Sequence, residues 1–286
     1  MTTHRIICGD SKDVLDTLAE GSAHLIITSP PYGNFRDYSD NPADLGNMDI
    51  HTQVSALLEI IAKSKRVLAP GRKLCLNHMD VPVVKEDGAE LIAIQTLLVP
   101  PILEMGFTLR HVIYWVKACV PSLWHIHTGT MPYPPSPIIT SGIEYILVFR
   151  DKRKQSLEHI SPEAKEASRV SIKGEWAKWA TGVWPLGSPP ERKKYHPAPF
   201  HEEIPRRLIK LFSFVGETIL DPFCGTGTVN LQAKLLARNS VGIDINPKYA
   251  ATAESLLRQD VIEIPRVDVP LSDKLDFFPE TLDKGA

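Results

Sequence analysis

Apolar and polar residues follow two patterns along this chain, one typical of strands and one typical of helices. Short apolar runs predict strands at 5–8, 24–28, 73–77, 109–117, 144–149, 218–220 and 241–245. Helical spacing of apolar residues and helix start and stop signals predict helices at 11–18, 53–68, 89–105, 201–212, 228–238 and 247–258. Strands that alternate with helices favour an α/β fold.

Polar stretches interrupt this alternation. Residues 33–52 are turn-rich and residues 120–138 are proline-rich, so both predict loops. Residues 150–195 are polar and basic without clear periodicity, and we interpret them as an inserted module. We therefore predict two halves of one domain at 1–149 and 196–260, an insertion at 150–195, and an acidic tail at 261–286.

The composition is that of an ordinary globular protein. With 286 residues, 43% of them hydrophobic and 23% charged, the chain is long enough for one large α/β domain with an insertion or for two small domains. No apolar run approaches the roughly 18–20 residues of a membrane span, and no signal-peptide core is evident. Four scattered cysteines favour a reducing cytoplasm over a disulfide framework or a structural zinc site. We expect a cytoplasmic protein without a membrane partner.

Charge is distributed unevenly, although the net charge is only −2. The basic residues gather between 150 and 207, and the candidates for contact with nucleic acid are Lys152, Arg153, Lys154, Arg192, Lys193 and Lys194. The acidic tail would mask such a basic face in the average charge. Each run taken alone also fits a solvated surface.

A glycine-rich turn follows the apolar strand at 218–220. Gly225 and Gly227 permit a tight turn and close approach of the backbone to a ligand. Asp244 lies at the end of the next strand and 23 residues after Asp221, where a carboxylate can accept hydrogen bonds from ribose hydroxyls. The turn lacks the third glycine that a pyrophosphate favours, so S-adenosylmethionine fits better than NAD. A helix-capping loop with no ligand is the simpler alternative.

A second turn, Ser29-Pro30-Pro31-Tyr32, follows the strand at 24–28. The two prolines remove N–H donors, so this turn offers mainly acceptors. If the amine of a nucleobase donates to Ser29 Oγ and to the Pro30 carbonyl, its nitrogen becomes more tetrahedral and its lone pair can point towards a methyl donor. Tyr32 supplies a flat face for an extruded base. A packing turn with a tyrosine is the alternative.

At these residues the chain resembles the amino-methyltransferases that modify exocyclic nitrogens of DNA bases, in the permuted β group where the catalytic turn precedes the cofactor turn. The resemblance implies catalytic roles for Ser29, Pro30, Pro31 and Tyr32. It also implies cofactor contacts for Asp10, Asp221, Phe223, Gly225, Gly227, Thr228 and Asp244, and for His196 and Pro197 in the segment before the cofactor strand. Arg72 departs from the family pattern, which has glycine there.

The permutation makes a structural prediction. The usual methyltransferase sheet begins at the glycine-turn strand, so the strand at 218–220 would be first, 241–245 second, 5–8 third, 24–28 fourth and 73–77 fifth. The pair at 109–117 and 144–149 would complete a mixed, seven-stranded, Rossmann-like sheet. This order brings Asp10, Ser29, Gly225 and Asp244 to the carboxyl ends of the strands.

The resemblance implies a restriction-modification enzyme that flips a base out of double-stranded DNA and methylates it with S-adenosylmethionine. Serine in the first position of the catalytic turn is similar to enzymes acting on cytosine N4, and adenine N6 is the alternative. An RNA or protein-amide methyltransferase, or a DNA-binding module without catalysis, is a more remote alternative. The family also allows a cognate restriction endonuclease and a homodimer as partners.

Weaker signals add little. The histidines at 78, 111, 125 and 127 have no carboxylate or cysteine at ligand spacing, so we expect no metal. Phe35, Arg36 and Tyr38 follow the catalytic turn and either close over DNA or anchor the loop. The tryptophans at 124, 176, 179 and 184 favour packing over base stacking.

Overall fold

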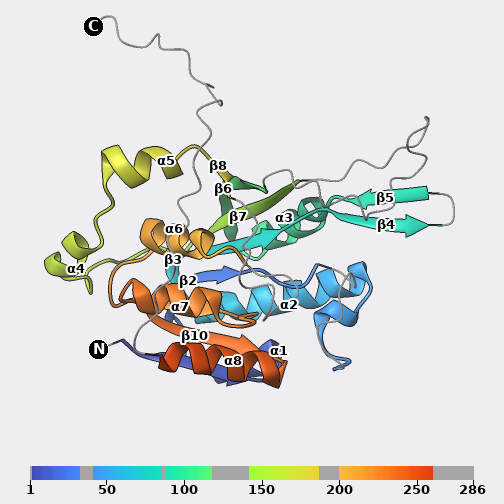
Figure 1. Cartoon of the computed structure of the whole chain (residues 1–286), viewed down its shortest axis with the longest axis horizontal. Coiled ribbons are helices and arrows are strands. Elements are labelled where there is room, and N and C mark those ends of the chain that lie inside the picture. The colour runs from blue at the N-terminus through green and yellow to red at the C-terminus, as the bar shows by residue number, and fades with distance from the viewer. Residues whose placement is uncertain (1, 33–40, 86–87, 118–141, 187–199, 260–286) are drawn as a thin grey trace, which may run out of the picture.

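The computed structural model describes residues 2–32, 41–85, 88–117, 142–186 and 200–259. Within these residues, the strands of the main sheet are β1 (His4–Cys8), β2 (Ala23–Thr28), β3 (Leu68–His78), β6 (Phe107–Val116), β7 (Ile143–Asp151), β8 (Val183–Pro185), β9 (Thr218–Asp221) and β10 (Asn239–Asp244). They are ordered β1-β10-β9-β2-β3-β7-β6-β8 (Figure 1).

The sheet order confirms the permuted arrangement. Strands β9 and β10, from the C-terminal part of the chain, lie between β1 and β2 from the N-terminal part. Neighbours from β1 to β3 are parallel, whereas β7 is antiparallel to both β3 and β6. The carboxyl ends of the five parallel strands therefore share one edge of the sheet, which we call the carboxyl edge. The opposite edge is the amino edge.

Helices cover both faces of this sheet. The described helices are α1 (Ser11–Thr17), α2 (Ile50–Val67), α3 (Ile94–Glu104), α4 (Pro162–Ala167), α5 (Ala177–Trp179), α6 (Glu203–Phe212), α7 (Thr228–Leu235) and α8 (Pro247–Arg258), with short turns of other helix at Leu45–Asn47 and Ile172–Trp176. None of them is both long and apolar enough to cross a membrane.

Strand β2 shows why two hydrophobic layers form. Its side chains alternate between faces, as they must in a strand. Ile26 joins a buried cluster with α1, α2 and α3, whereas Leu25 and Ile27 join a second buried cluster with α6 and α7. A fully buried side chain of this size contributes about 1.5–3 kcal/mol. The near-continuous apolar run of β2 thus fixes it at the centre of a three-layer sandwich.

The segment predicted as a helix at 89–105 is helical only from Ile94. Before it, β4 (Val81–Lys85) and β5 (Gly88–Ile92) form an antiparallel hairpin that extends away from the main sheet in Figure 1. The expectation of helix at 89–93 is therefore wrong. Cross-strand pairing with β4 stabilises these residues as a strand, and a local pattern does not reveal such a partner.

The described part of the region 150–195, which ends at residue 186, contributes to the body of the protein. Its strand β8 pairs with β6 and adds an eighth strand to the seven that were predicted. Trp179 and Trp184 are buried in the same cluster as Leu25, and the Trp184 indole N–H donates to the carbonyl of Trp179 (3.0 Å). Three residues are too few to show a strand period, which explains why the sequence pattern missed β8. Strand β7 extends to Asp151, beyond the expected boundary at 149.

Candidate active site

Polar groups from five parallel strands meet at the carboxyl edge. Asp10 follows β1, Ser29 follows β2, and Asn77 lies near the end of β3. Asp221 ends β9, and Asp244 ends β10. The backbone N–H of Gly9 donates to the carbonyl of Asp244 (2.9 Å), which ties the ends of β1 and β10 together. The structure thus brings together the residues that the permuted order predicts at one edge.

The glycine turn after β9 is held by two carboxylates. Asp221 Oδ1 accepts from the N–H of Phe223 (3.0 Å) and from the hydroxyl of Thr28 (2.8 Å). Asp244 accepts from the N–H of Gly225 (2.8 Å) and from the N–H of Asn246 (2.8 Å). Each carboxylate therefore fixes the backbone of the turn while standing at its own strand end.

Gly227 is required by both conformation and space. Its φ is +80°, in the left-handed region, directly before Thr228 begins α7. A side chain here would place a Cβ 2.9 Å from Cβ of Ala253 on α8. Gly225 also has a positive φ of +51°. The turn thus places its backbone beside the start of α7, which is the arrangement that binds nucleotide-type ligands.

Burial shifts the acidity of both carboxylates. It raises the pKa of Asp221 to about 7 and that of Asp244 to about 6. Neither acid forms an ion pair with a described lysine or arginine, so each charge is stabilised by backbone and hydroxyl donors. Acidic side chains with shifted pKa values and no cationic partner are typical of ligand-binding sites.

The chemistry of this edge fits S-adenosylmethionine. A carboxylate has about four acceptor positions, and the two donors to Asp244 leave capacity for a ribose diol. Asp10 caps α1 through the N–H of Lys12 (2.8 Å) and likewise retains acceptor capacity. The left-handed glycines leave the backbone approachable. These residues would hold the nucleoside part of the cofactor.

The turn Ser29-Pro30-Pro31-Tyr32, which we call the catalytic turn after its predicted role, is embedded in a polar network. Ser29 Oγ lies 2.6 Å from the Tyr32 hydroxyl, and that hydroxyl donates to Glu144 Oε2 (3.0 Å). The Asn77 amide donates to Glu144 Oε2 (2.7 Å), to Ser29 Oγ (3.3 Å) and to the Tyr32 hydroxyl. Lys117 forms an ion pair with the other oxygen of Glu144. The side chain at Tyr32 is thus fixed at its hydroxyl end.

Two further contacts, from a helix and from the end of a neighbouring strand, support this turn. The side-chain amide of Gln53, on α2, donates to the carbonyl of Pro31 (2.6 Å). The ring of His78 packs against the ring of Tyr32 with centroids 4.8 Å apart. Burial lowers the pKa of His78 to about 4, so this ring is neutral at physiological pH. These contacts hold the Pro31 carbonyl and the Tyr32 ring in place.

Sequence reasoning missed Asn77, Glu144, Lys117 and Gln53 as parts of the site. A glutamate at the start of an aromatic, β-branched strand was the available signal, because a carboxylate is seldom buried without a partner or a role. Only 4% of Glu144 is exposed. The departure at Arg72 is explained by a buried ion pair with Glu217, which compensates its charge.

Part of the prediction falls outside the described residues, namely His196, Pro197, Arg36, Arg192, Lys193 and Lys194. The other basic run, Lys152 to Lys154, follows β7. Because β7 is antiparallel to β3, with Lys73 opposite Arg150, this run leaves the sheet at the amino edge. Arg153 donates to Asp151 (2.5 Å) and to the carbonyl of Leu68 (2.7 Å). The structure therefore does not bring this run to the catalytic turn.

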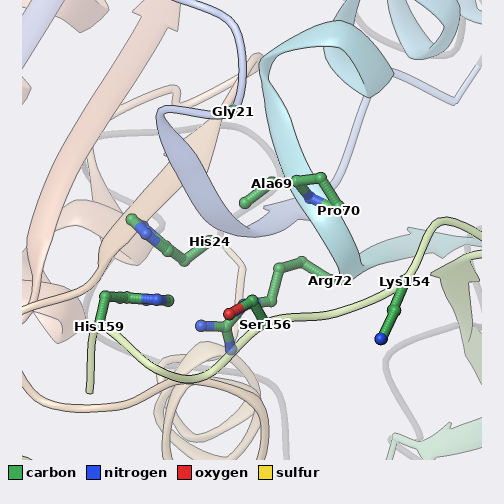
Figure 2. Close-up of a pocket in the computed structure, with 8 residues that line it drawn as sticks. All are labelled: Gly21, His24, Ala69, Pro70, Arg72, Lys154, Ser156 and His159. Atoms are coloured by element: carbon green, nitrogen blue, oxygen red, sulfur yellow. The ribbon is translucent and has the colours of Figure 1, made fainter. Parts of the chain in front are cut away.

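A pocket of about 290 Å³ lies at the amino edge (Figure 2). His24 and His159 border it, and together with Glu217 they place three potential metal-ligand atoms within 4.8 Å of one another. These are not the histidines considered from the sequence. However, Glu217 already pairs with Arg72 and accepts from the N–H of Phe214 (2.8 Å). A metal ion would have to displace the guanidinium, so this cluster is better described as an ion pair with two histidines beside it.

The fold and the residues at the carboxyl edge define a Rossmann-like methyltransferase of the S-adenosylmethionine-dependent class. The model of the family described as DNA methylase, which groups N6 and N4 methyltransferases, matches residues 23–255. The chain belongs to this family of DNA amino-methyltransferases.

Individual relatives agree with this assignment. The chain is 30% identical over 275 residues to the Type II methyltransferase M.MjaI of Methanocaldococcus jannaschii, covering 86% of this chain and 88% of that protein. TTHA0409 of Thermus thermophilus, a candidate DNA modification methylase solved in complex with S-adenosyl-L-methionine, is 28% identical with a TM-score of 0.70 and covers 90% of this chain and 94% of that chain. PvuII DNA methyltransferase, which is cytosine-N4-specific, shares the fold with a TM-score of 0.65 at 19% identity, over 92% of this chain and 89% of that chain.

Proposed function

We propose that this protein is a Type II DNA methyltransferase that transfers a methyl group from S-adenosylmethionine to the exocyclic N4 of cytosine in double-stranded DNA. One observation carries the proposal. The Thr28 hydroxyl, directly before the catalytic turn, donates to Asp221 of the glycine turn (2.8 Å). This hydrogen bond joins the methyl-accepting and methyl-donating halves of the site at one sheet edge.

The cofactor half orients its ligand through fixed acceptors and backbone. Asp244 would accept the ribose hydroxyls, and Asp10 would contact the adenine of the cofactor. The glycine turn and Phe223 would lie beside the nucleoside, while Asp221 keeps the turn in place through the Phe223 N–H. S-adenosylmethionine supplies an electrophilic methyl group when bound. The chain's task is to present the nucleophile to it in the right geometry, because positioning accounts for much of such a rate enhancement.

The catalytic turn prepares a weak nucleophile. Ser29 Oγ and the Pro30 carbonyl accept the two N–H groups of the amine, which frees its lone pair from the ring. The nitrogen would then form the new N–C bond as the sulfur–methyl bond of the donor breaks, with the sulfur keeping the electron pair and leaving as S-adenosylhomocysteine. The excess proton would leave the methylated nitrogen as a strongly acidic ammonium proton, so no strong base is required. The target must first rotate out of the duplex, and the face of Tyr32 is offered for stacking, which is worth about 1–3 kcal/mol.

Serine at position 29 supports cytosine as the target base, and adenine N6 is the alternative. Both amines donate two N–H groups, so acceptor geometry alone does not separate them. The predicted homodimer and cognate restriction endonuclease stay predictions of the Type II assignment.

The test is a product analysis. Purified protein is incubated with S-adenosylmethionine and unmethylated genomic DNA, the DNA is digested to nucleosides, and the modified base is identified by mass spectrometry. We expect N4-methylcytosine, and its loss in a Ser29→Ala/Tyr32→Ala variant that still binds the cofactor. Exclusive N6-methyladenine would refute the choice of base. An absence of methylated base despite cofactor binding would refute the activity.

A further inference from the structure

Glu144 determines the direction of the hydrogen bonds at the catalytic turn. As a carboxylate it can only accept, and it accepts from the Asn77 amide (2.7 Å) and from the Tyr32 hydroxyl (3.0 Å). Lys117 pairs with its second oxygen and compensates the buried charge. Because Tyr32 has one hydroxyl proton, that proton is committed to Glu144.

The consequence falls on Ser29. Its Oγ lies 2.6 Å from the Tyr32 oxygen, which has already given its proton to Glu144. The proton between the two oxygens must therefore belong to Ser29, which donates it to Tyr32. The Ser29 oxygen is left with lone pairs and with no proton to offer. A substrate group that meets this oxygen must be a donor.

Asn77 supports the same direction. Its amide is 1% exposed, and its nitrogen faces Glu144 because the reversed amide would place two acceptors against each other. The second N–H therefore points to Ser29 Oγ and the Tyr32 oxygen. This orientation leaves Asn77 Oδ1 buried and without a partner among the described residues. Buried polar atoms are rarely left unpaired, and a site that tolerates one marks a functional constraint.

We propose that Glu144 is a positioning residue that holds Ser29 Oγ as a pure acceptor, so that the site selects an exocyclic amine and rejects a carbonyl oxygen at the same position of the base. This inference rests on the proposed methyltransferase activity and deepens it. It explains how a serine, which can donate or accept, distinguishes cytosine from uracil or adenine from hypoxanthine. A buried group that finds no complementary partner costs far more than a mismatched apolar contact.

The experiment compares DNA duplexes that differ at one base, which carries either an amine or a carbonyl at the same ring position. The wild-type product first identifies the target base. Duplexes carrying the unmodified target base are then compared with duplexes carrying its carbonyl analogue, which is uracil for cytosine or hypoxanthine for adenine. Binding of each duplex is measured in the presence of S-adenosylhomocysteine, and kcat and KM are measured on the amine substrate. The altered base pair affects all variants alike, so the change in the amine-to-carbonyl ratio between variants isolates the contribution of the site.

We expect Glu144→Gln to lower kcat by about 10- to 100-fold, as for the loss of one charge-assisted hydrogen bond, with cofactor affinity unchanged. We expect its amine-to-carbonyl binding ratio to fall by about tenfold, since glutamine can donate to Tyr32 and release the Ser29 proton. Tyr32→Phe should relax the ratio to the same extent, because it removes the acceptor for that proton. The double variant should be no more relaxed than either single variant, since both act through the same proton.

The matched control is Glu158→Gln, an exposed carboxylate outside this network, and it should leave both quantities unchanged. An unchanged binding ratio in Glu144→Gln and Tyr32→Phe would overturn the inference while leaving the methyltransferase activity standing. A wild-type protein that methylates no base would instead overturn the proposed function. If Glu144→Gln does not fold, Tyr32→Phe alone decides the question.

Discussion

Both edges of the sheet bury carboxylates, but they stabilise them in different ways. At the amino edge, Glu217 pairs with Arg72, and Asp151 pairs with Arg153. At the carboxyl edge, Glu144 also pairs with a lysine, Lys117. Asp221 and Asp244, however, accept from backbone and hydroxyl donors instead. Burial raises the pKa of both of these acids, to about 7 and about 6. The amino edge uses ion pairs to hold the fold, whereas the two acids of the glycine turn at the carboxyl edge stay available to a ligand.

The largest expected effect is a loss of stability when the ion pair at the amino edge is broken. Arg72→Ala would leave the buried Glu217 without its arginine partner, since the side chains of this pair are only 4% and 3% exposed. The Phe214 N–H and the His159 ring, 3.5 Å away, would remain beside its carboxylate. We expect the free energy of unfolding to fall by about 3–5 kcal/mol, measured by urea denaturation. Arg72→Met combined with Glu217→Gln removes both charges and should recover most of that stability. A loss below about 1 kcal/mol in Arg72→Ala would show that the pair is not what holds this edge.

The second prediction concerns the carboxyl edge, where removing the charge of Asp221 should raise the free energy of unfolding instead of lowering it. Both hydrogen bonds to Asp221 reach one oxygen, Oδ1, which Asp221→Asn retains. The pKa of Asp221 is about 7 in the folded protein against an ordinary value of 3.8, so the folded state binds more protons between these values. The contribution of Asp221 to wild-type stability therefore falls as pH rises from about 4 to about 7.

The asparagine variant lacks this titration. At pH 8 we expect it to be more stable than the wild type, by on the order of 1–4 kcal/mol, and at pH 3 to differ little. We also expect weaker binding of the cationic cofactor, by about tenfold, because a negative charge beside the glycine turn is lost. Urea denaturation across the pH range and calorimetric titration with S-adenosylmethionine measure the two effects. The exposed Asp16→Asn serves as control, and an equal pH dependence in both variants would contradict the prediction.

The contrast between the edges also separates what the sequence revealed from what it did not. The strand order was predictable from the resemblance to the permuted methyltransferases. The residues at the carboxyl edge were predictable because glycine turns, a proline turn and strand-end acids are local signals with a known place on a parallel sheet. Glu144 was not predictable in this way. It approaches Ser29 and Tyr32 only because β7 pairs with β3 in a register that places Tyr145 opposite His78. The sequence of one strand alone does not determine which of its residues pair with those of a distant strand.

The same limit explains the basic run after β7. A cluster of positive residues indicates a charged surface, but it carries no information on which edge of the sheet that surface faces. The antiparallel direction of β7 decides this. Similarly, β8 and the β4–β5 hairpin form through pairing with a partner strand, and their short segments show no decisive period of their own.

The smallest expected effect tests the amino edge as a DNA surface. Lys152 and Lys154 leave the sheet on the side away from the catalytic turn, and Lys154 borders the amino-edge pocket. A double variant, Lys152→Ala/Lys154→Ala, should change DNA affinity by less than about twofold. Two lysines that contact phosphates would each contribute about one unit to the slope of log affinity against log salt concentration. Filter binding or fluorescence anisotropy over a range of salt concentrations measures that slope. A slope reduced by about two would show that Lys152 and Lys154 contact DNA phosphates at the amino edge, and an unchanged slope would show that they do not.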